Sequence, residues 1–396
     1  MPYPPKDGGA QLVHYTSRGL IAHGIDLSVL SVNPLRCYVP PESLPESYVS
    51  DCNFKCVRVD TRLHPLRMIT NLFGSESYFI ERFRSADFES ALIALLKEKD
   101  FDIVQIEHLY LCRYVSVIRR WSRAAIVFRP QNVEHEIWER YLRNLREPVR
   151  RVLLRTAVRR LKKFEGHVPG TVDGIIALTP DDAAFFRSAS DRTPVETIPM
   201  GYDYEKLKDY DPEEQYRYPL SVYHLGSMEW LPNEEAVWWL IRKVLPVLEE
   251  KMFSGKIHIA GRNMPGRIFR YKSDMLKITA EVNDPLDFQK DKQIMIVPLW
   301  SGSGIRAKII EGLALGKTII STSVGAQGIR YDDGKNLLIA DTPEAFASHI
   351  VRCAENPALC REMGRQAAML GRSRYDYFLN AGGMITFYQQ IMNAHV

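Results

Sequence analysis

A run of glycines, serines and cations between residues 297 and 328 is the part of this sequence best suited to chemistry. It reads VPLWSGSGIRAKIIEGLALGKTIISTSVGAQG. An apolar strand precedes the loop SGSG, and the helix after the loop opens with Arg306 and Lys308. A glycine-rich turn before a helix presents backbone N–H groups and the positive end of the helix dipole to an anion. The two cations suit a diphosphate in particular.

The same segment can also be a buried strand–helix unit with a solvated, cationic first turn. Cations at a helix start oppose the helix dipole and cost a little stability unless an anion neutralises them, which favours the anion site. Glu311 lies about one helical turn beyond Lys308. Its carboxylate could accept hydrogen bonds from the hydroxyl groups of a sugar or a ribose.

Polar residues follow other apolar runs as well, where the carboxyl ends of parallel strands would gather them. Asn132, Glu134 and His135 follow the run AAIVFR and are acceptor-side candidates, although His135 is equally well explained as a surface or helix-capping histidine. Arg262 ends the run KIHIAG and either reaches a diphosphate or is a solvated loop arginine. Gly8 with Gly9 would let the backbone approach a ligand closely, although such pairs also mark ordinary turns.

The elements that must position these residues alternate between short apolar strands and amphipathic helices, which predicts parallel α/β layers. The strands of the first half are predicted at 26–32, 56–60, 102–107, 124–129, 174–179 and 196–200. Those of the second half are predicted at 221–227, 256–261, 276–282, 293–298, 318–322 and 336–341. The two series predict two Rossmann-like, doubly wound domains that face each other across a cleft, joined by the polar, tyrosine-rich stretch 202–218.

Composition excludes several other classes of protein. The chain has 396 residues, 45% of them hydrophobic and 25% charged, and a net charge of +4 that gives no indication of nucleic acid. No apolar run approaches the roughly 18–20 residues of a membrane span. The start, MPYPPKDGGAQ, does not resemble a signal peptide, and six scattered cysteines favour free thiols in a reducing cytoplasm.

Residues 140–163 are strongly basic, with ten arginines and lysines and one acidic residue. An apolar stripe at helical spacing runs through the segment, formed by Leu153, Leu154, Ala157, Val158 and Leu161. The segment could contact anionic lipid headgroups at a membrane surface. It could equally be a helix packed on the sheet with a basic outer face.

The motifs together resemble the retaining GT-B glycosyltransferases of family 4, over nearly the whole chain. The segment from Gly302 to Thr322 is similar to the branch written GSGxRxKxxEGxAxGxxVxST, with Ser303 where the usual pattern of the family has its first Glu. Residues 225–233 resemble the GxMxWxPN segment, and 199–203 resemble the PxGxD hinge. Residues 129–140 resemble RxHNVEHxxWxR, with Gln131 in place of the first His.

This resemblance implies residue roles, and the absence of an Asp-x-Asp motif in a plausible place fits the metal-independent transfer that it suggests. The implied catalytic set is Arg306, Lys308, Glu311 and His135. The implied donor-binding set is Gly226, Ser227, Arg262, Val282, Ser301, Gly302, Ser303 and Gly304. The implied acceptor-side set is Gly8, Gly9, Asn132 and Glu134.

The implied activity is transfer of a sugar from a nucleotide-diphosphate donor, with retention, to a glycan or lipid-linked acceptor, in surface polysaccharide synthesis. We expect no cofactor and no nucleic-acid partner. The expected location of the protein is the cytoplasm, as a peripheral protein at the inner face of the membrane. The implied domains are 1–203, completed by a C-terminal helix at 378–396, and 204–377. An inactive sugar-binding or scaffold paralogue and a nucleotide-sugar epimerase of the same fold are the alternatives.

Chains of this type usually open with a strand before the Gly-Gly loop, whereas this sequence begins inside the loop. That strand is normally central in its sheet, so its loss would expose both neighbours. Either the true start lies upstream or the chain is a damaged copy, and the first is favoured. We therefore expect better folding of the first domain in a chain extended upstream by about ten residues.

Overall fold

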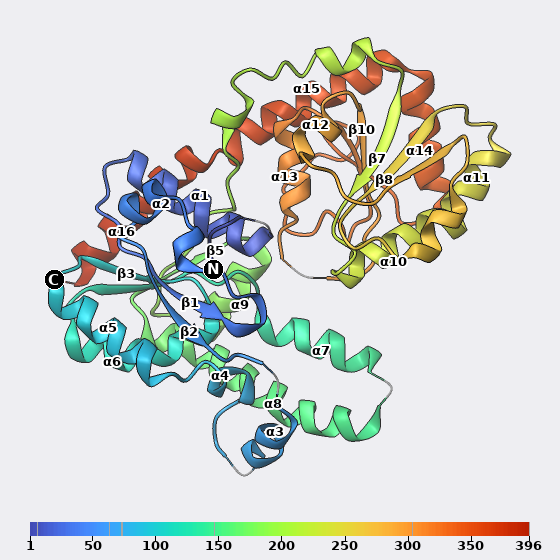
Figure 1. Cartoon of the computed structure of the whole chain (residues 1–396). Coiled ribbons are helices and arrows are strands. Elements are labelled where there is room, and N and C mark those ends of the chain that lie inside the picture. Colours follow the sequence, from blue (N-terminus) through green and yellow to red (C-terminus); the bar gives the residue numbers. More distant parts are fainter. Residues whose placement is uncertain (6, 63, 73, 146, 303, 396) are drawn as a thin grey trace. The chain divides into compact units, whose positions relative to one another are not determined.

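The structure is a computed structural model that describes residues 1–5, 7–62, 64–72, 74–145, 147–302 and 304–395 (Figure 1). The chain forms two compact units, one of Met1–Met200 with Tyr377–Val396 and one of Gly201–Asp376. The sequence placed these boundaries at 203/204 and 377/378. The second unit is thus inserted between two parts of the first.

All twelve predicted strands correspond to strands of the structure, with ends displaced by up to four residues. Those of unit 1 are β1 (Leu30–Pro34), β2 (Lys55–Val59), β3 (Ile103–Ile106), β4 (Ala125–Phe128), β5 (Gly174–Ala177) and β6 (Val195–Thr197). Those of unit 2 are β7 (Ser221–Leu225), β8 (Lys256–Ala260), β9 (Leu276–Thr279), β10 (Ile294–Val297), β11 (Thr318–Ser321) and β12 (Leu338–Ile339). Every residue of β4, β5, β10 and β11 is buried, which is typical of parallel strands covered on both faces.

Ten α-helices lie in the described part of unit 1 and six in that of unit 2. The first set is α1 (Gly8–Ala22), α2 (Glu46–Asp51), α3 (Pro65–Asn71), α4 (Tyr78–Glu81), α5 (Ala86–Glu98), α6 (Val115–Trp121), α7 (Glu134–Asn144), α8 (Pro148–His167), α9 (Pro180–Ala189) and α16 (Tyr377–His395). The second set is α10 (Leu231–Trp239), α11 (Leu245–Glu250), α12 (Pro285–Gln289), α13 (Ala307–Ala314), α14 (Pro343–Glu355) and α15 (Pro357–Arg374).

Side-chain caps fix where several helices begin. Asp7 accepts a hydrogen bond from the backbone of Ala10 at the start of α1, and Thr342 accepts one from Ala345 at the start of α14. Asn356 caps α15 in the same way, through the N–H of Leu359. Each cap satisfies an N–H group that the helix itself leaves unpaired.

The sheet of unit 2 is parallel and has the order β12-β11-β10-β7-β8-β9. The chain therefore runs outward from β7 through β8 and β9, then returns to the other side of β7 to form β10, β11 and β12. In doubly wound sheets, ligands bind at the carboxyl ends of the strands beside such a reversal. That rule directs attention to the residues that follow β7, β8 and β10.

Unit 1 holds two separate parallel sheets among its described residues, β1-β2 and β3-β4-β5-β6. Within the described part of unit 1, β1 pairs only with β2, and β3 only with β4. The upstream strand expected from the sequence stays a prediction.

The C-terminal helix α16 packs into unit 1, where its red ribbon lies beside the blue α1 in Figure 1. Its apolar side chains Ala381, Met384 and Phe387 share a core with residues of β4 and β5. A Cβ on Gly19 of α1 would lie 2.7 Å from the Cβ of Ala381, which shows how closely the two helices approach. The contact is therefore part of the core of unit 1.

Candidate functional site

The ends of β7 and β8 are joined by backbone hydrogen bonds beyond the sheet ladder. The N–H of Gly226 donates to the carbonyl oxygen of Ala260 over 3.0 Å, and the N–H of Met228 donates to that of Arg262 over 2.9 Å. Ser227 and Arg262 are thereby brought to neighbouring positions, and both are partly buried. The side-chain oxygen of Ser227 is buried and has no hydrogen-bond partner among the described residues. Buried hydroxyls are normally paired, so this atom is a candidate ligand contact.

Two glycines make this junction fit together. A Cβ on Gly261 would lie 1.7 Å from the carbonyl oxygen of Gly226, a distance that no side chain tolerates. A Cβ on Gly226 would lie 2.7 Å from the carboxamide of Asn233 in the first turn of α10. The sequence predicted that Gly226 admits a nucleotide; in the structure, its lack of a side chain makes room for Asn233.

Lys308, in the first turn of α13, reaches back to the same junction. Its Nζ donates to Oδ1 of Asn233 over 2.8 Å, and Nδ2 of Asn233 donates to the carbonyl oxygen of Ser227 over 2.8 Å. Burial lowers the pKa of Lys308 to about 7, with a further contribution from Arg306, while Glu311 opposes the shift. The Lys308 amine is thus held by a neutral amide. An anion that binds beside the amine would favour the charged form of Lys308.

Arg306 stands at the N-cap position of α13 and is 4% exposed. Its Nη1 donates to the carbonyl oxygen of Gly304 over 2.7 Å, and its guanidinium carbon lies 5.7 Å from the ring centre of Trp230. Gly302 has a φ of +110°, and a Cβ there would lie 3.1 Å from both Arg306 and Trp230. Arg306 therefore packs against the predicted anion loop and fixes its backbone.

Three other residues that the sequence assigned to donor binding are Ser301, Ser303 and Val282. Ser301 is partly buried, and its hydroxyl donates to Oε2 of Glu235 over 2.5 Å. Ser303, which the sequence assigned to donor binding, lies outside the described residues. Val282, three residues beyond the end of β9, is partly buried on the same edge of the sheet.

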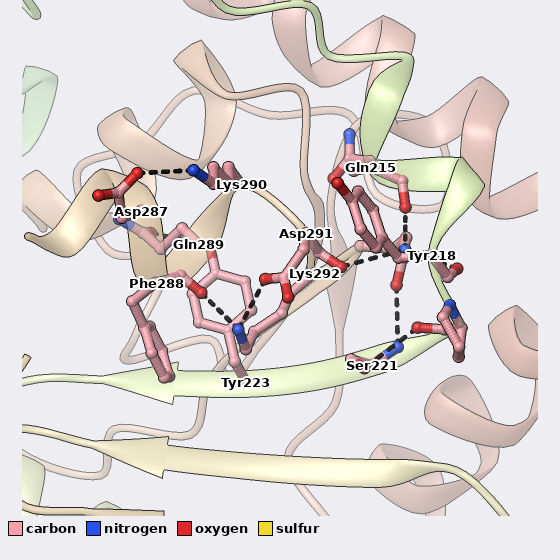
Figure 2. Close-up of polar contacts among 12 residues, drawn as sticks. Gln215, Tyr218, Ser221, Tyr223, Asp287, Phe288, Gln289, Lys290, Asp291 and Lys292 are labelled. Atoms are coloured by element: carbon pink, nitrogen blue, oxygen red, sulfur yellow. Dashed lines mark hydrogen bonds and ion pairs between the residues drawn. The ribbon is translucent and has the colours of Figure 1, made fainter.

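Glu311 lies on α13 one turn beyond Lys308 and is partly buried. Burial raises the pKa of Glu311, whereas the amide of Gln289 and the amines of Lys206 and Lys308 lower it. Gln289 is fully buried at the end of α12, and its Oε1 accepts a hydrogen bond of 2.9 Å from Tyr223 of β7 (Figure 2). A carboxylate in this position can accept hydrogen bonds from a hydroxylated ligand.

Two ion pairs and the hydrogen bonds of a buried lysine hold the chain around Gln289. Figure 2 draws the ion pairs Asp287–Lys290 and Asp291–Lys292 as dashed lines. The fully buried Nζ of Lys317 donates to Gln215 Oε1 and to the carbonyl oxygens of Gln289 and Lys292, over 2.7–2.9 Å. Because three acceptors need three N–H groups, this geometry favours the charged amine, although burial lowers the pKa of Lys317 to about 7. Lys317 thus anchors the segment that carries Gln289.

A buried histidine that the sequence gave no reason to single out lies on β7. His224 is fully buried, and its Nδ1 lies 3.0 Å from the carbonyl oxygen of Ile296. Since a carbonyl only accepts, Nδ1 carries the proton and Nε2 does not. Nε2 is buried and unpaired among the described residues, and burial, assisted by Lys308, lowers the pKa of His224 to about 3. His224 is a neutral neighbour of the Lys308 cation.

In unit 1, the pair Gly8 and Gly9 lies close to a residue that follows β4, which in turn contacts a residue that follows β3. Gly8 and Gly9 begin α1, and a Cβ on Gly9 would lie 2.7 Å from Oε1 of Gln131. Nε2 of Gln131 lies 3.3 Å from Nε2 of His108, which follows β3. Burial lowers the pKa of His108 to about 4, so this ring is neutral. His108 is a second histidine that no local sequence pattern indicated.

Asn132 and Glu134 follow β4, where the sequence placed the acceptor side, and both are partly buried. Oε2 of Glu134 accepts a hydrogen bond of 2.7 Å from Tyr110. Burial raises the pKa of Glu134 to about 7, although the Tyr110 bond opposes the shift. Glu134 is therefore the titratable group of this set that can hold or release a proton near neutrality.

His135 has a structural partner. It is 3% exposed, and its Nδ1 donates to Oε2 of Glu165 over 2.7 Å. The same carboxylate accepts the backbone N–H groups of Glu134 over 2.7 Å and His135 over 3.0 Å, and so caps α7 from α8. Glu165, and not His135, therefore caps the helix, and His135 is a buried partner of that carboxylate. We leave His135 out of the chemistry proposed below.

The basic segment forms α7 and α8, with one face of α8 in the core. Four residues of the predicted apolar stripe are buried, namely Leu154, Ala157, Val158 and Leu161. The side chain of Leu153 lies outside the described side chains. The apolar stripe therefore packs in the core of unit 1 and is covered, as in the alternative of a helix packed on the sheet with a basic outer face. The exposed face carries Arg151, Arg155, Arg159 and Lys163 at intervals of four residues.

Among the described residues, no group of three or more His, Cys, Asp or Glu side chains is placed to hold a metal ion. None of their helices is long and apolar enough to cross a membrane.

Comparison with known proteins agrees with this architecture. Residues 219–356, from β7 to the end of α14, match the family model described as glycosyl transferases group 1. A protein of Klebsiella pneumoniae, described as an uncharacterized 44.6 kDa protein in the cps region, is 26% identical over 165 residues. That match covers 39% of this chain, and the chain spans only 42% of the length of this curated relative.

Solved structures resemble the chain over almost its full length. A sucrose-phosphate synthase of Thermosynechococcus elongatus matches with a TM-score of 0.69 at 15% identity, covering 98% of this chain and 94% of that one. The Anabaena protein HepE, solved in complex with UDP and glucose, matches with a TM-score of 0.61 at 11% identity, covering 97% and 96%. At these identities, the likeness establishes the fold. The chain has the GT-B fold, and its residues 219–356 are similar to the group 1 glycosyl transferases.

Proposed function

We propose that this protein transfers a sugar from a nucleotide-diphosphate donor, with retention at the anomeric carbon, to a glycan or lipid-linked acceptor. The observation that carries the proposal is the pair of cations at the start of α13. Lys308 is bonded to an amide oxygen and Arg306 to a backbone carbonyl, beside the positive end of an eight-residue helix. Cations gathered at this end of a helix are unfavourable until an anion joins them, and a diphosphate supplies the right charge.

In the proposed mechanism, negative charge builds on the diphosphate as the bond from the sugar to the leaving oxygen breaks. Lys308 and the N–H groups of the loop before α13 would stabilise that charge, and Arg306 would hold the loop in shape. Glu311 would orient the ribose through its hydroxyls. The acceptor hydroxyl would bond to the anomeric carbon on the face that the diphosphate leaves, and its proton would pass to the leaving phosphate. Glu134 and Asn132 in unit 1 are the proposed acceptor contacts.

Two likenesses support the choice of substrates. HepE was solved with UDP and glucose, which makes a UDP-linked sugar the first donor to test. The Klebsiella relative is encoded in a cps region, which supports a role in surface polysaccharide assembly in the cytoplasm. Titration with UDP and GDP, followed by transfer assays with the matching sugar nucleotides, tests the proposal. Donor binding without transfer would instead indicate a sugar-binding paralogue, and inversion at a sugar carbon would indicate an epimerase.

Transfer should be independent of divalent metal. The charge of the leaving diphosphate would be balanced by Lys308, Arg306 and backbone N–H groups, so no ion is needed for that task. We expect full activity in excess EDTA, measured by release of the nucleoside diphosphate. A complete loss on chelation that Mg²⁺ or Mn²⁺ restores would contradict the mechanism.

We further propose that unit 1 meets an anionic membrane surface through the exposed cations of α8. Like charges four residues apart repel along a helix, and an anionic surface would relieve that repulsion. The stripe is formed by Arg151, Arg155, Arg159 and Lys163. Each cation near an anionic leaflet is worth about 1 kcal/mol.

Replacing the four cations of the stripe with glutamine should reduce binding to vesicles of phosphatidylglycerol by at least about tenfold. The control replaces four exposed lysines of unit 2, namely Lys243, Lys251, Lys256 and Lys335. Co-sedimentation at two salt concentrations measures both variants. Equal binding by the two variants, or equal binding to phosphatidylcholine vesicles, would contradict the proposal.

A further inference from the structure

We propose that Asn233 is a positioning residue for the donor diphosphate: its neutral carboxamide holds the Lys308 amine at the end of β7 and leaves the positive charge of that amine for the ligand. The inference rests on the proposed function, because it assigns the phosphate-binding cation to Lys308. It adds a requirement for an amide at residue 233, where a carboxylate of the same shape would fail.

The orientation of the Asn233 carboxamide is fixed by its two partners. Oδ1 faces the Lys308 amine, which only donates, and Nδ2 faces the carbonyl oxygen of Ser227, which only accepts. A reversed amide would place two donors together and two acceptors together. Asn233 is 4% exposed, so water cannot replace either bond easily. The amide therefore has one stable orientation, and it aims its oxygen at Lys308.

The position of the carboxamide is fixed by the glycine that it packs on. A Cβ on Gly226 would lie 2.7 Å from both Cγ and Nδ2 of Asn233. Gly226 and Asn233 are seven residues apart, one at the end of β7 and the other in the first turn of α10. Any side chain at residue 226 would displace the amide, and with it the Lys308 amine.

The neutrality of the amide matters because of the groups around Lys308. Arg306 repels the amine, Glu311 attracts it, and His224 is uncharged because burial lowers its pKa to about 3. Among the described residues, the hydrogen-bond partner of the Lys308 amine is the amide oxygen of Asn233 and not a carboxylate. A diphosphate would supply that partner and draw a proton onto the amine. A carboxylate at residue 233 would form the ion pair in advance and compete with the phosphate.

The protein should therefore take up protons when the donor binds. Burial lowers the pKa of free Lys308 to about 7, and a bound diphosphate would raise it. Between the two pKa values, binding must bring a proton, so affinity should fall by up to tenfold for each unit of rising pH. The window from pH 7 to 9 lies above the second phosphate ionisation near 6, which keeps the ligand's own titration out of the measurement.

The experiment measures UDP binding by calorimetry from pH 7 to 9, in two buffers with different heats of ionisation. We expect wild-type protein to take up protons and lose affinity as pH rises. Asn233→Asp should bind UDP at least tenfold more weakly at pH 7, with little proton uptake, because its Lys308 is already charged. Asn233→Leu should also bind more weakly, because Lys308 loses its hydrogen bond. Asn356→Asp is the control, since it adds the same charge at a helix cap of unit 2 where Asp serves as well as Asn.

The results distinguish failure of the positioning role of Asn233 from failure of the proposed function. If Asn233→Asp matches wild type in affinity and proton uptake within twofold, the positioning role is wrong and the proposed function stands. If wild-type protein binds neither UDP nor GDP, the proposed function itself fails. Urea melts of each variant establish that the second unit is folded. Gly226→Ala provides an independent test, because it should weaken UDP binding by displacing an unchanged Asn233; wild-type affinity in that variant would also overturn the role.

Discussion

Replacing Gly261 with alanine is expected to destabilise unit 2 by about 3 kcal/mol or more. The new Cβ would lie 1.7 Å from the carbonyl oxygen of Gly226. Because the obstacle is backbone at the end of a central strand, no rotamer change relieves it. The ends of β7 and β8 would have to separate, and the hydrogen bond from Met228 to Arg262 would be lost with them.

Urea unfolding followed by tryptophan fluorescence measures this effect, since Trp230, Trp238, Trp239 and Trp300 all lie in unit 2. Gly266→Ala is the matched control. A Cβ there meets nothing within 4 Å, so its unfolding free energy should change by less than about 1 kcal/mol. Coincident melts of the two variants would show that the strand ends can separate at little cost.

Lys308→Ala should weaken UDP or GDP binding by about 1.5–3 kcal/mol, which is the range for hydrogen bonds to a charged group. The loss should exceed that of an exposed lysine because the amine is held in place before the ligand arrives, by Asn233 at 2.8 Å. Isothermal titration measures the change. Lys335→Ala, an exposed position in the same unit, should leave the Kd unchanged.

Arg306→Ala should cost a similar amount of affinity, through the loop as well as through charge. The guanidinium donates to the carbonyl oxygen of Gly304 and packs beside Gly302, so its removal frees the backbone that would receive the phosphate. Unchanged titrations in both the Lys308 and the Arg306 variants would rule out the donor site proposed here.

The strands could be predicted from the sequence because buried parallel strands leave an unmistakable local pattern. Runs such as IMIV and TIIS are apolar on both faces, and the alternation with helices then implies the order of layers. The first strand was placed four residues too early, at 26–32 rather than Leu30–Pro34. The apolar pattern there continues into extended chain that precedes the β1–β2 ladder, and pattern alone does not reveal where pairing begins.

The contacts that define the candidate site could not be predicted in the same way. Asn233 and Lys308 are 75 residues apart, and each is unremarkable within its own helix. His224 and His108 were missed because a buried histidine in or after a strand carries no local signal. The sequence left His135 as an acceptor-side residue or as a surface or helix-capping histidine, and it could not reveal the bond to the distant Glu165. Sequence pattern located the segments, whereas partners across the fold determine what each side chain does.

The return of α16 to unit 1 also sets an order of events during synthesis. Everything that unit 2 needs lies between Gly201 and Asp376, so its core can close as soon as that stretch has left the ribosome. The core shared by Leu20, Val127 and Ile176 must wait for Met384 and Phe387, which are translated after all of unit 2. Nearly the whole of unit 1 is therefore made first and completed last, and until then its apolar faces are exposed to chaperones, proteases and other nascent chains.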